Sequence, residues 1–198
     1  MRTPMNFPSW EEIYKSMPVE TMPWFCRELD HDLAVELKQR NLTTGTFLDI
    51  GTGPGTQAIE LAKLGFTVTG TDISETAIRQ AQVSKSPVTF VTDDIVHNTL
   101  TGPFNFIFDR GCFHMLEVSE RPTYVRTVSD MLPNDGLFFL KCFSLRETNI
   151  VDGPFRYTPD EVRATFGSHF TIESIIETEY RGTLTPNPLA LFAVMTKK

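Results

Sequence analysis

The chain has 198 residues, of which 40% are hydrophobic and 22% are charged, with a formal net charge of −7 at pH 7. These values predict one globular domain, and the negative charge without any run of Lys and Arg argues against a nucleic-acid partner. The three cysteines are widely spaced and form no C-x-x-C pair, so we expect neither a metal site nor a disulfide framework. No apolar segment is long enough for a signal core or a membrane span, and we expect a cytoplasmic protein with no membrane partner.

Residues 1–26 are expected to form an irregular arm, because several prolines interrupt any long element. Within this arm, Ser9 can cap a short helix. The apolar run MPWF around Trp24 either packs on the core or closes over a bound ligand as a lid. The single main domain is predicted over residues 27–198, and it begins with an amphipathic helix over residues 27–40.

Residues 46–62 predict a buried strand, a glycine turn and a helix in succession. Gly51, Gly53 and Gly55 alternate in the turn, whereas a dinucleotide-binding loop needs the spacing G-x-G-x-x-G. Asp49 stands just before the turn, where a carboxylate disfavours a diphosphate and favours a ligand that carries an ammonium group. The spacing and the carboxylate together argue against an NAD-dependent oxidoreductase.

Acidic residues also end the next two predicted strands. Asp72 follows the second strand, about 20 residues after the first glycine, where a Rossmann-like fold places an acid on ribose hydroxyls. Ile73 beside it offers an apolar surface to a nucleobase. The third strand, over residues 88–91, is followed by Asp93 and Asp94.

The fourth predicted strand, over residues 104–108, ends in the charged pair Asp109-Arg110 and a glycine. In a doubly wound sheet this strand borders the crevice in which ligands bind. His114 follows closely and is either an ordinary buried histidine or a proton acceptor at the edge of a pocket. The rest of the chain predicts helices over residues 119–132 and 158–166, strands over 137–143, 170–178 and 189–195, and an irregular loop over 144–157.

The motifs at these strand ends resemble those of the class I S-adenosylmethionine-dependent methyltransferases. Asp49, Gly51, Gly53 and Gly55 match the pattern E/D-x-G-x-G-x-G that closes the first strand in that family. The D-R-G segment from Asp109 and the Pro-Trp pair of the arm resemble the thiopurine-, thiol- and tellurite-type branch. The resemblance implies an α/β, Rossmann-like fold with a seven-stranded, mostly parallel sheet in the order 3-2-1-4-5-7-6 and helices on both faces.

The resemblance also implies where S-adenosylmethionine binds. The first glycine loop would hold the aminoacyl end, Asp72 the ribose, and Asp94 with Ile95 the adenine, although Asp93 competes for that role. The arginine of the D-R-G segment would contact the cofactor through its backbone. The residues expected to bind the cofactor are Trp24, Asp49, Gly51, Thr52, Gly53, Gly55, Asp72, Ile73, Asp94, Ile95, Asp109 and Arg110.

We expect direct methyl transfer to a small molecule, such as a thiol or another soft nucleophile, by a monomer or homodimer. His114 would serve as a general base if the acceptor carries a proton. A cofactor-binding protein of the same fold without turnover is the alternative, because the motifs describe cofactor binding only. The expected acceptor pocket is formed by Trp10, Trp24, Phe113, Phe143 and Tyr157, with Arg110, Arg146 and Arg156 as nearby cations.

Overall fold

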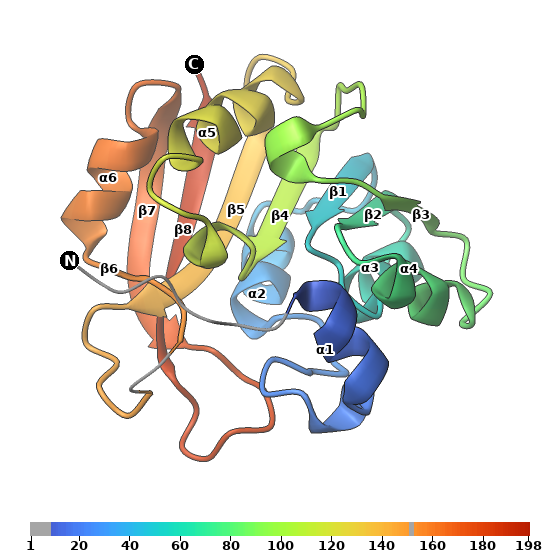
Figure 1. The fold of residues 1–198 in the computed structure, drawn as a ribbon. Helices are drawn as coiled ribbons and strands as arrows, with labels where there is room; N and C mark the ends of the chain where they lie inside the picture. The colour runs from blue at the N-terminus through green and yellow to red at the C-terminus, as the bar shows by residue number, and fades with distance from the viewer. Residues whose placement is uncertain (1–8, 151–152) are drawn as a thin grey trace.

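The computed structural model describes residues 9–150 and 153–198, and its centre is one mixed sheet. The strands lie in the order β3-β2-β1-β4-β5-β8-β7, with β6 paired to β5 (Figure 1). They are β1 (Thr46–Ile50), β2 (Thr67–Asp72), β3 (Thr89–Thr92), β4 (Phe106–Arg110), β5 (Leu137–Ser144), β6 (Arg156–Tyr157), β7 (Phe170–Glu179) and β8 (Leu189–Lys197). Only β8 runs antiparallel to its neighbours β5 and β7. The predicted Rossmann-like fold and its strand order are therefore confirmed.

One strand was not predicted. The loop expected over residues 144–157 contains β6, which lies parallel to β5 with Phe143 opposite Arg156. The Leu145 N–H also donates to the Tyr157 carbonyl at 2.7 Å. Two residues are too few to show an alternating pattern, so the sequence carried no signal for this strand. Residues 151–152 of the same loop, like residues 1–8 of the predicted arm, lie outside the described part of the chain.

Six α-helices and three short 3₁₀ helices complete the described part of the chain. They are α1 (Trp10–Ser16), η1 (Val19–Thr21), α2 (His31–Gln39), α3 (Thr56–Lys63), α4 (Glu75–Gln82), η2 (Ile95–His97), η3 (Phe113–Met115), α5 (Arg121–Asp130) and α6 (Pro159–Phe166). Ser9 caps α1 in a capping box with Glu12, as its position predicts. The helix expected from residue 27 begins only at His31, because the Asp30 side chain accepts the backbone N–H groups of its first turn.

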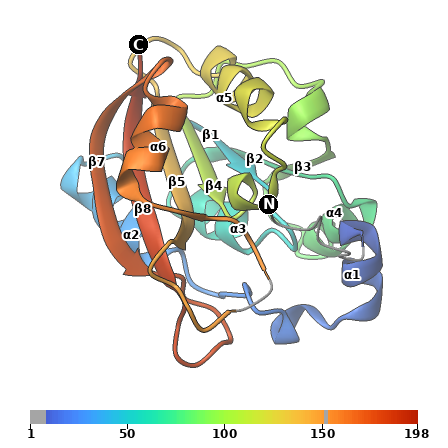
Figure 2. The same cartoon turned by 60° about the vertical axis from the view of Figure 1, so that its left-hand side comes forward.

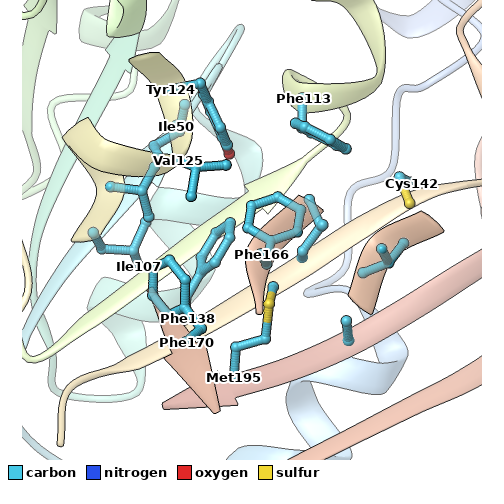
Figure 3. Close-up of a cluster of buried hydrophobic side chains, with 14 of the residues drawn as sticks. Ile50, Ile107, Phe113, Tyr124, Val125, Phe138, Cys142, Phe166, Phe170 and Met195 are labelled. Carbon is cyan, nitrogen blue, oxygen red and sulfur yellow. The ribbon is translucent and has the colours of Figure 1, made fainter. Parts of the chain in front are cut away.

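The two faces of the sheet are buried by different helices (Figures 1 and 2). Leu48, Ile50 and Ile107 point to the face covered by α5 and α6, where Figure 3 shows the aromatic core. Phe47 and Phe108, on the alternate positions of the same strands, pack with α2 and α3. Because both faces are covered, a ligand is expected at the carboxyl ends of the strands.

The first segment of the chain lies at this carboxyl end. Helix α1 packs against α4, and the segment that follows it passes beneath the ends of β4 and β5 (Figure 1). No helix among residues 9–150 and 153–198 has the length and apolarity that a membrane span requires.

Candidate active site

The conformation of the loop after β1 favours glycine at its three alternating positions. Gly51, Gly53 and Gly55 have φ angles of 66°, 54° and 81°, a left-handed region that favours glycine. A Cβ at Gly53 would lie 2.6 Å from the Tyr14 hydroxyl, and one at Gly55 would lie 2.6 Å from the Phe90 ring. The alternating glycines therefore reflect both the backbone conformation and the close approach of neighbouring side chains.

Two buried carboxylates flank this loop without a side-chain cation. Asp49 accepts a hydrogen bond from the Thr52 hydroxyl at 2.5 Å, and Asp72 accepts the backbone N–H groups of Gly53 at 2.9 Å and Ser74 at 2.8 Å. Burial raises the pKa of Asp49 to about 7 and that of Asp72 to about 6. Neither forms an ion pair within the described residues. A cation or a hydroxyl group brought by a ligand would relieve this unfavourable burial.

The two candidate acids after β3 have different surroundings. Asp93 is occupied, because one of its oxygens accepts both the backbone N–H and the hydroxyl of Thr99 at 2.9 and 2.7 Å. Asp94 caps η2 through the Val96 N–H at 3.0 Å and contacts His97 Nδ1 at 2.8 Å, yet its side chain remains 34% exposed. Ile95 is buried beside it, whereas Ile73 is 54% exposed at the end of β2. This arrangement favours Asp94 over Asp93 as the residue that is free to meet a ligand.

The side chains of Asp109 and Arg110 bind other groups of the protein, so contact of this pair with the cofactor through the Arg110 backbone stays a prediction. Asp109 is fully buried and accepts the N–H groups of residues 111, 112 and 113 together with the Tyr124 hydroxyl. Arg110 instead forms an ion pair with Asp30, with Nε 3.0 Å from Oδ2, and donates to the backbone carbonyl of Trp24 at 2.9 Å. The Arg110 carbonyl accepts the Tyr180 hydroxyl at 2.6 Å. In this structure Arg110 therefore acts within the protein rather than as a free cation.

The N-terminal segment covers the glycine loop. The rings of Trp10, Tyr14 and Trp24 form an aromatic group, with Trp10 and Trp24 edge-to-face at 5.5 Å. Tyr14 lies directly over Gly53. The Thr183 N–H donates to the Pro23 carbonyl at 3.1 Å, so the loop after β7 also holds the segment. This placement agrees both with an arm packed permanently on the core and with a lid over a bound ligand. That the arm closes when a ligand binds remains a prediction.

His114 lies beside the rings of Phe143 and Tyr180 but is not arranged as a proton acceptor. Its Nδ1 accepts the Phe143 N–H at 3.1 Å, so the neutral ring carries its proton on Nε2 and has no free lone pair. Burial, together with the charge of Arg110, lowers the pKa of His114 to about 3. The geometry does not support the predicted general base.

The predicted pocket wall divides between two places. Trp24 and Phe143 meet beside Tyr180, a residue that no motif in the sequence marks. Phe113 and Tyr157 belong instead to the core under α5 and α6, with ring centroids 5.0 Å apart. Arg146 is exposed, whereas Arg156 lies near that core. In the described part of the chain, no group of His, Cys, Asp and Glu side chains could hold a metal ion.

Comparison with known proteins places this site in a family. A profile of the methyltransferase domain matches residues 47–136. An uncharacterized methyltransferase from Schizosaccharomyces pombe is 39% identical over 107 residues, which cover 52% of this chain and 72% of that relative. Together with the fold, these matches show that the chain belongs to the S-adenosylmethionine-dependent methyltransferases with a Rossmann-like fold.

Relatives with named substrates differ in their acceptors. Thiocyanate methyltransferase 1 from Arabidopsis thaliana is 27% identical over 151 residues, covering 73% of this chain and 64% of the relative. Human EEF1A lysine methyltransferase 2 is 28% identical over 131 residues, covering 59% of this chain and 56% of the relative. A structure described for the conversion of a disulfide bond into a thioacetal group in echinomycin biosynthesis has a TM-score of 0.81 at 24% identity, covering 95% of this chain and 90% of that one. The comparisons therefore define the family and leave the acceptor open.

Proposed function

We propose that this chain transfers a methyl group from S-adenosylmethionine to a small, soft nucleophile such as a thiol. The observation that carries the choice of acceptor is the bond from the Phe143 N–H to His114 Nδ1. An alcohol, phenol or ammonium acceptor must lose a proton during the reaction, and such acceptors usually need a positioned base. A thiolate reacts without one, and His114 has no lone pair to offer.

The residues around the glycine loop fit the cofactor. Asp49 and Asp72 are buried acids whose pKa values are raised to about 7 and about 6, and the cofactor brings an ammonium group, a positive sulfur and two vicinal ribose hydroxyls. In this proposal Asp72 accepts hydrogen bonds from the ribose hydroxyls, and Asp49 stabilises the aminoacyl end of the cofactor, which carries the ammonium group. Asp94, Ile95 and Ile73 surround the adenine, as the pattern of the family suggests.

The chain's own residues would make room for the cofactor and enclose the methyl group. When bound, the cofactor supplies a methyl group already activated by the positive charge on its sulfur. Tyr14 occupies the space above Gly53, so it must move aside when a ligand reaches that position. Trp24, Phe143 and Tyr180 would exclude water from the methyl group and align the acceptor with it.

A small acceptor agrees with the surroundings of this site. The N-terminal segment closes the carboxyl end of the sheet, and no basic stripe marks a nucleic-acid surface. Two of the similar proteins are described through sulfur chemistry, the thiocyanate methyltransferase and the protein of echinomycin biosynthesis. These likenesses support a sulfur acceptor without identifying it.

The test is a screen of thiols, halides, phenols and amines for release of S-adenosylhomocysteine, with wild type and His114→Asn. The Asn amide oxygen can accept the Phe143 N–H, so the variant keeps the structural bond and removes the imidazole. With a thiol at pH 8 we expect kcat to change by less than about threefold, whereas loss of a general base would reduce it about 10²-fold or more.

Three outcomes would contradict the proposal. One is a loss of about 10²-fold with a thiol in His114→Asn, since it would make the imidazole a base. Another is methylation of a protein lysine with no turnover of any small molecule. The third is cofactor binding without turnover in the whole screen, which would favour the non-catalytic alternative.

A further inference from the structure

A second cavity lies on the side of the sheet covered by α5 and α6, away from the glycine loop. Its volume is about 370 Å³, and it lies between the start of α5, β6 and α6 (Figure 1). Arg121, Phe155, Arg156, Tyr157 and Glu161 form most of its lining. A cavity of this size is at the lower end of the range for small-molecule sites.

Three hydrogen-bond donors in this lining are buried without a partner in the described residues. They are Arg121 Nε, Arg156 Nε and the Tyr157 hydroxyl. Tyr157 as a whole is only 3% exposed. Buried polar groups in proteins are nearly always paired, so three unpaired donors in the lining of one cavity indicate a missing acceptor.

Aromatic rings hold the first arginine in place. The Arg121 guanidinium lies 4.4 Å from the Phe155 ring centre and 5.2 Å from that of Tyr157. Arg121 also donates a long hydrogen bond from Nη2 to the Leu116 carbonyl at 3.4 Å. Neither Arg121 nor Arg156 forms an ion pair within 4.0 Å in the described part of the chain. Among the described residues, the two arginines that line this cavity therefore have no carboxylate within ion-pair distance.

Glu161 is the one acid among the described residues of the lining, and it already caps α6. Its Oε2 accepts the Thr158 N–H at 2.7 Å and the Thr158 hydroxyl at 3.1 Å, in the capping box of α6. The charge balance of the cavity is still positive, with two guanidinium groups against one carboxylate. The chain as a whole carries a net charge of −7, so its surface gives no general attraction for anions.

We propose that this cavity binds a small oxyanion, a phosphate, sulfate or carboxylate group, through Arg121, Arg156 and the Tyr157 hydroxyl. Guanidinium groups bind such anions through fixed, charge-assisted hydrogen bonds. The site is separate from the proposed methyl-transfer site, because its described lining contains neither the glycine loop nor Trp24, Phe143 and Tyr180. The cavity lining is nevertheless connected to the segment after β4, since the Phe155 N–H donates to the His114 carbonyl at 2.8 Å.

Calorimetry with inorganic phosphate, at ionic strength matched with sodium chloride, tests this site in the full chain. We expect saturable binding of one phosphate, weakened about tenfold or more in Arg121→Gln and in Arg156→Gln. Arg126→Gln, an exposed change on the same helix, is the matched control and should leave the binding unchanged. Tyr157→Phe, which removes only the hydroxyl, should weaken it severalfold.

Glu161→Gln is expected to strengthen phosphate binding, whereas the Arg121, Arg156 and Tyr157 variants weaken it. Glutamine keeps the capping box but removes the negative charge, so phosphate should bind several times more tightly than to wild type. Absence of saturable phosphate binding to wild type would overturn the proposal. Equal weakening by Arg121→Gln and Arg126→Gln would also overturn it, as would unchanged affinity in both Tyr157→Phe and Glu161→Gln. The last two variants remain decisive if loss of the stacked Arg121 unfolds the chain.

Discussion

The acids at the strand ends show how similar residues take different roles. Asp49, Asp72 and Asp109 are all buried, and burial raises their pKa values to about 7, 6 and 6. Asp109 is enclosed by three backbone N–H groups and the Tyr124 hydroxyl, so it organises the turn after β4. Asp72 accepts only two backbone N–H groups, which leaves lone pairs for a ligand. The number of internal donors, rather than the residue type, separates Asp109 from Asp72, the acid that we propose binds the ribose.

Asp72→Asn is expected to weaken S-adenosylmethionine binding by about 1.5–3 kcal/mol, the range for hydrogen bonds to a charged group. Asparagine keeps one acceptor oxygen and the size of the side chain, so the turn should persist. Calorimetry on wild type, Asp72→Asn and the exposed Asp130→Asn would measure this loss. Equal affinities in all three proteins would remove Asp72 from the cofactor site.

Asp49 gives a prediction about pH. Its pKa is about 7 in the folded protein against an ordinary value of 3.8, so the folded state binds a proton that the unfolded state has lost. The stability that comes from the protonated form is complete below pH 3.8 and disappears as the pH rises through 7. The unfolding free energy of wild type should therefore fall relative to that of Asp49→Asn between pH 4 and 8.

Comparison with Asp49→Asn is necessary because other groups titrate in the same range. Burial lowers the pKa of His114 to about 3, and this shift makes the protein more stable as the pH rises toward 6.5. The difference between wild type and Asp49→Asn in chemical unfolding cancels that contribution. A difference that stays constant from pH 4 to 8 would show that Asp49 is ionised throughout.

At the scale of elements, the helices and strands could be predicted well because they depend on local patterns, whereas the strand order followed from the resemblance of the motifs to a known family. The glycine turn, the cap at Ser9 and the apolar strands each carry their own signal. The partners of Arg110 carry none, since they include Asp30 and the Trp24 carbonyl, both about 80 residues away in the chain. The tautomer of His114 in η3 likewise depends on the Phe143 N–H in β5, 29 residues further along the chain. Side-chain roles that depend on distant backbone groups could not be predicted from spacing.

The N-terminal segment is expected to become more ordered when S-adenosylmethionine binds. Lys15 on α1 is exposed, as is Lys85 after α4, so trypsin can reach both. Because Tyr14 and Trp24 lie against the glycine loop, the bound cofactor should slow cleavage at Lys15 and leave cleavage at Lys85 unchanged. Both tryptophans of the chain lie in this segment, so their fluorescence should change together with the protection. Equal cleavage rates at Lys15 with and without cofactor would favour a permanently packed arm.

At the scale of the whole molecule, a buried ion cluster connects segments far apart in the sequence. Lys141 in β5 lies 2.7 Å from both Asp30 and Asp32 at the start of α2, and Arg110 in β4 also binds Asp30. Burial opposes ionisation of Asp30, but the charges of Lys141 and Arg110 hold its pKa below the ordinary value. Arg110 also donates to the carbonyl of Arg181 in the loop after β7. The cluster thus joins the N-terminal segment, two central strands and the last loop beneath the proposed active site.

Lys141→Met should reduce the unfolding free energy by about 3–5 kcal/mol, because it leaves buried carboxylates without one of their cations. The double variant Asp30→Asn/Lys141→Met removes a charge of each sign and should recover part of that loss. Urea unfolding would measure both, with the exposed Lys63→Met on α3 as a control that changes stability by less than about 0.5 kcal/mol. A loss in Lys141→Met no larger than in this control, or a double variant less stable than Lys141→Met alone, would contradict the argument. If Lys141→Met is much less stable than the control and the double variant recovers part of the loss, the position of Arg110 and of the arm bound to it depends on the buried charge of Lys141.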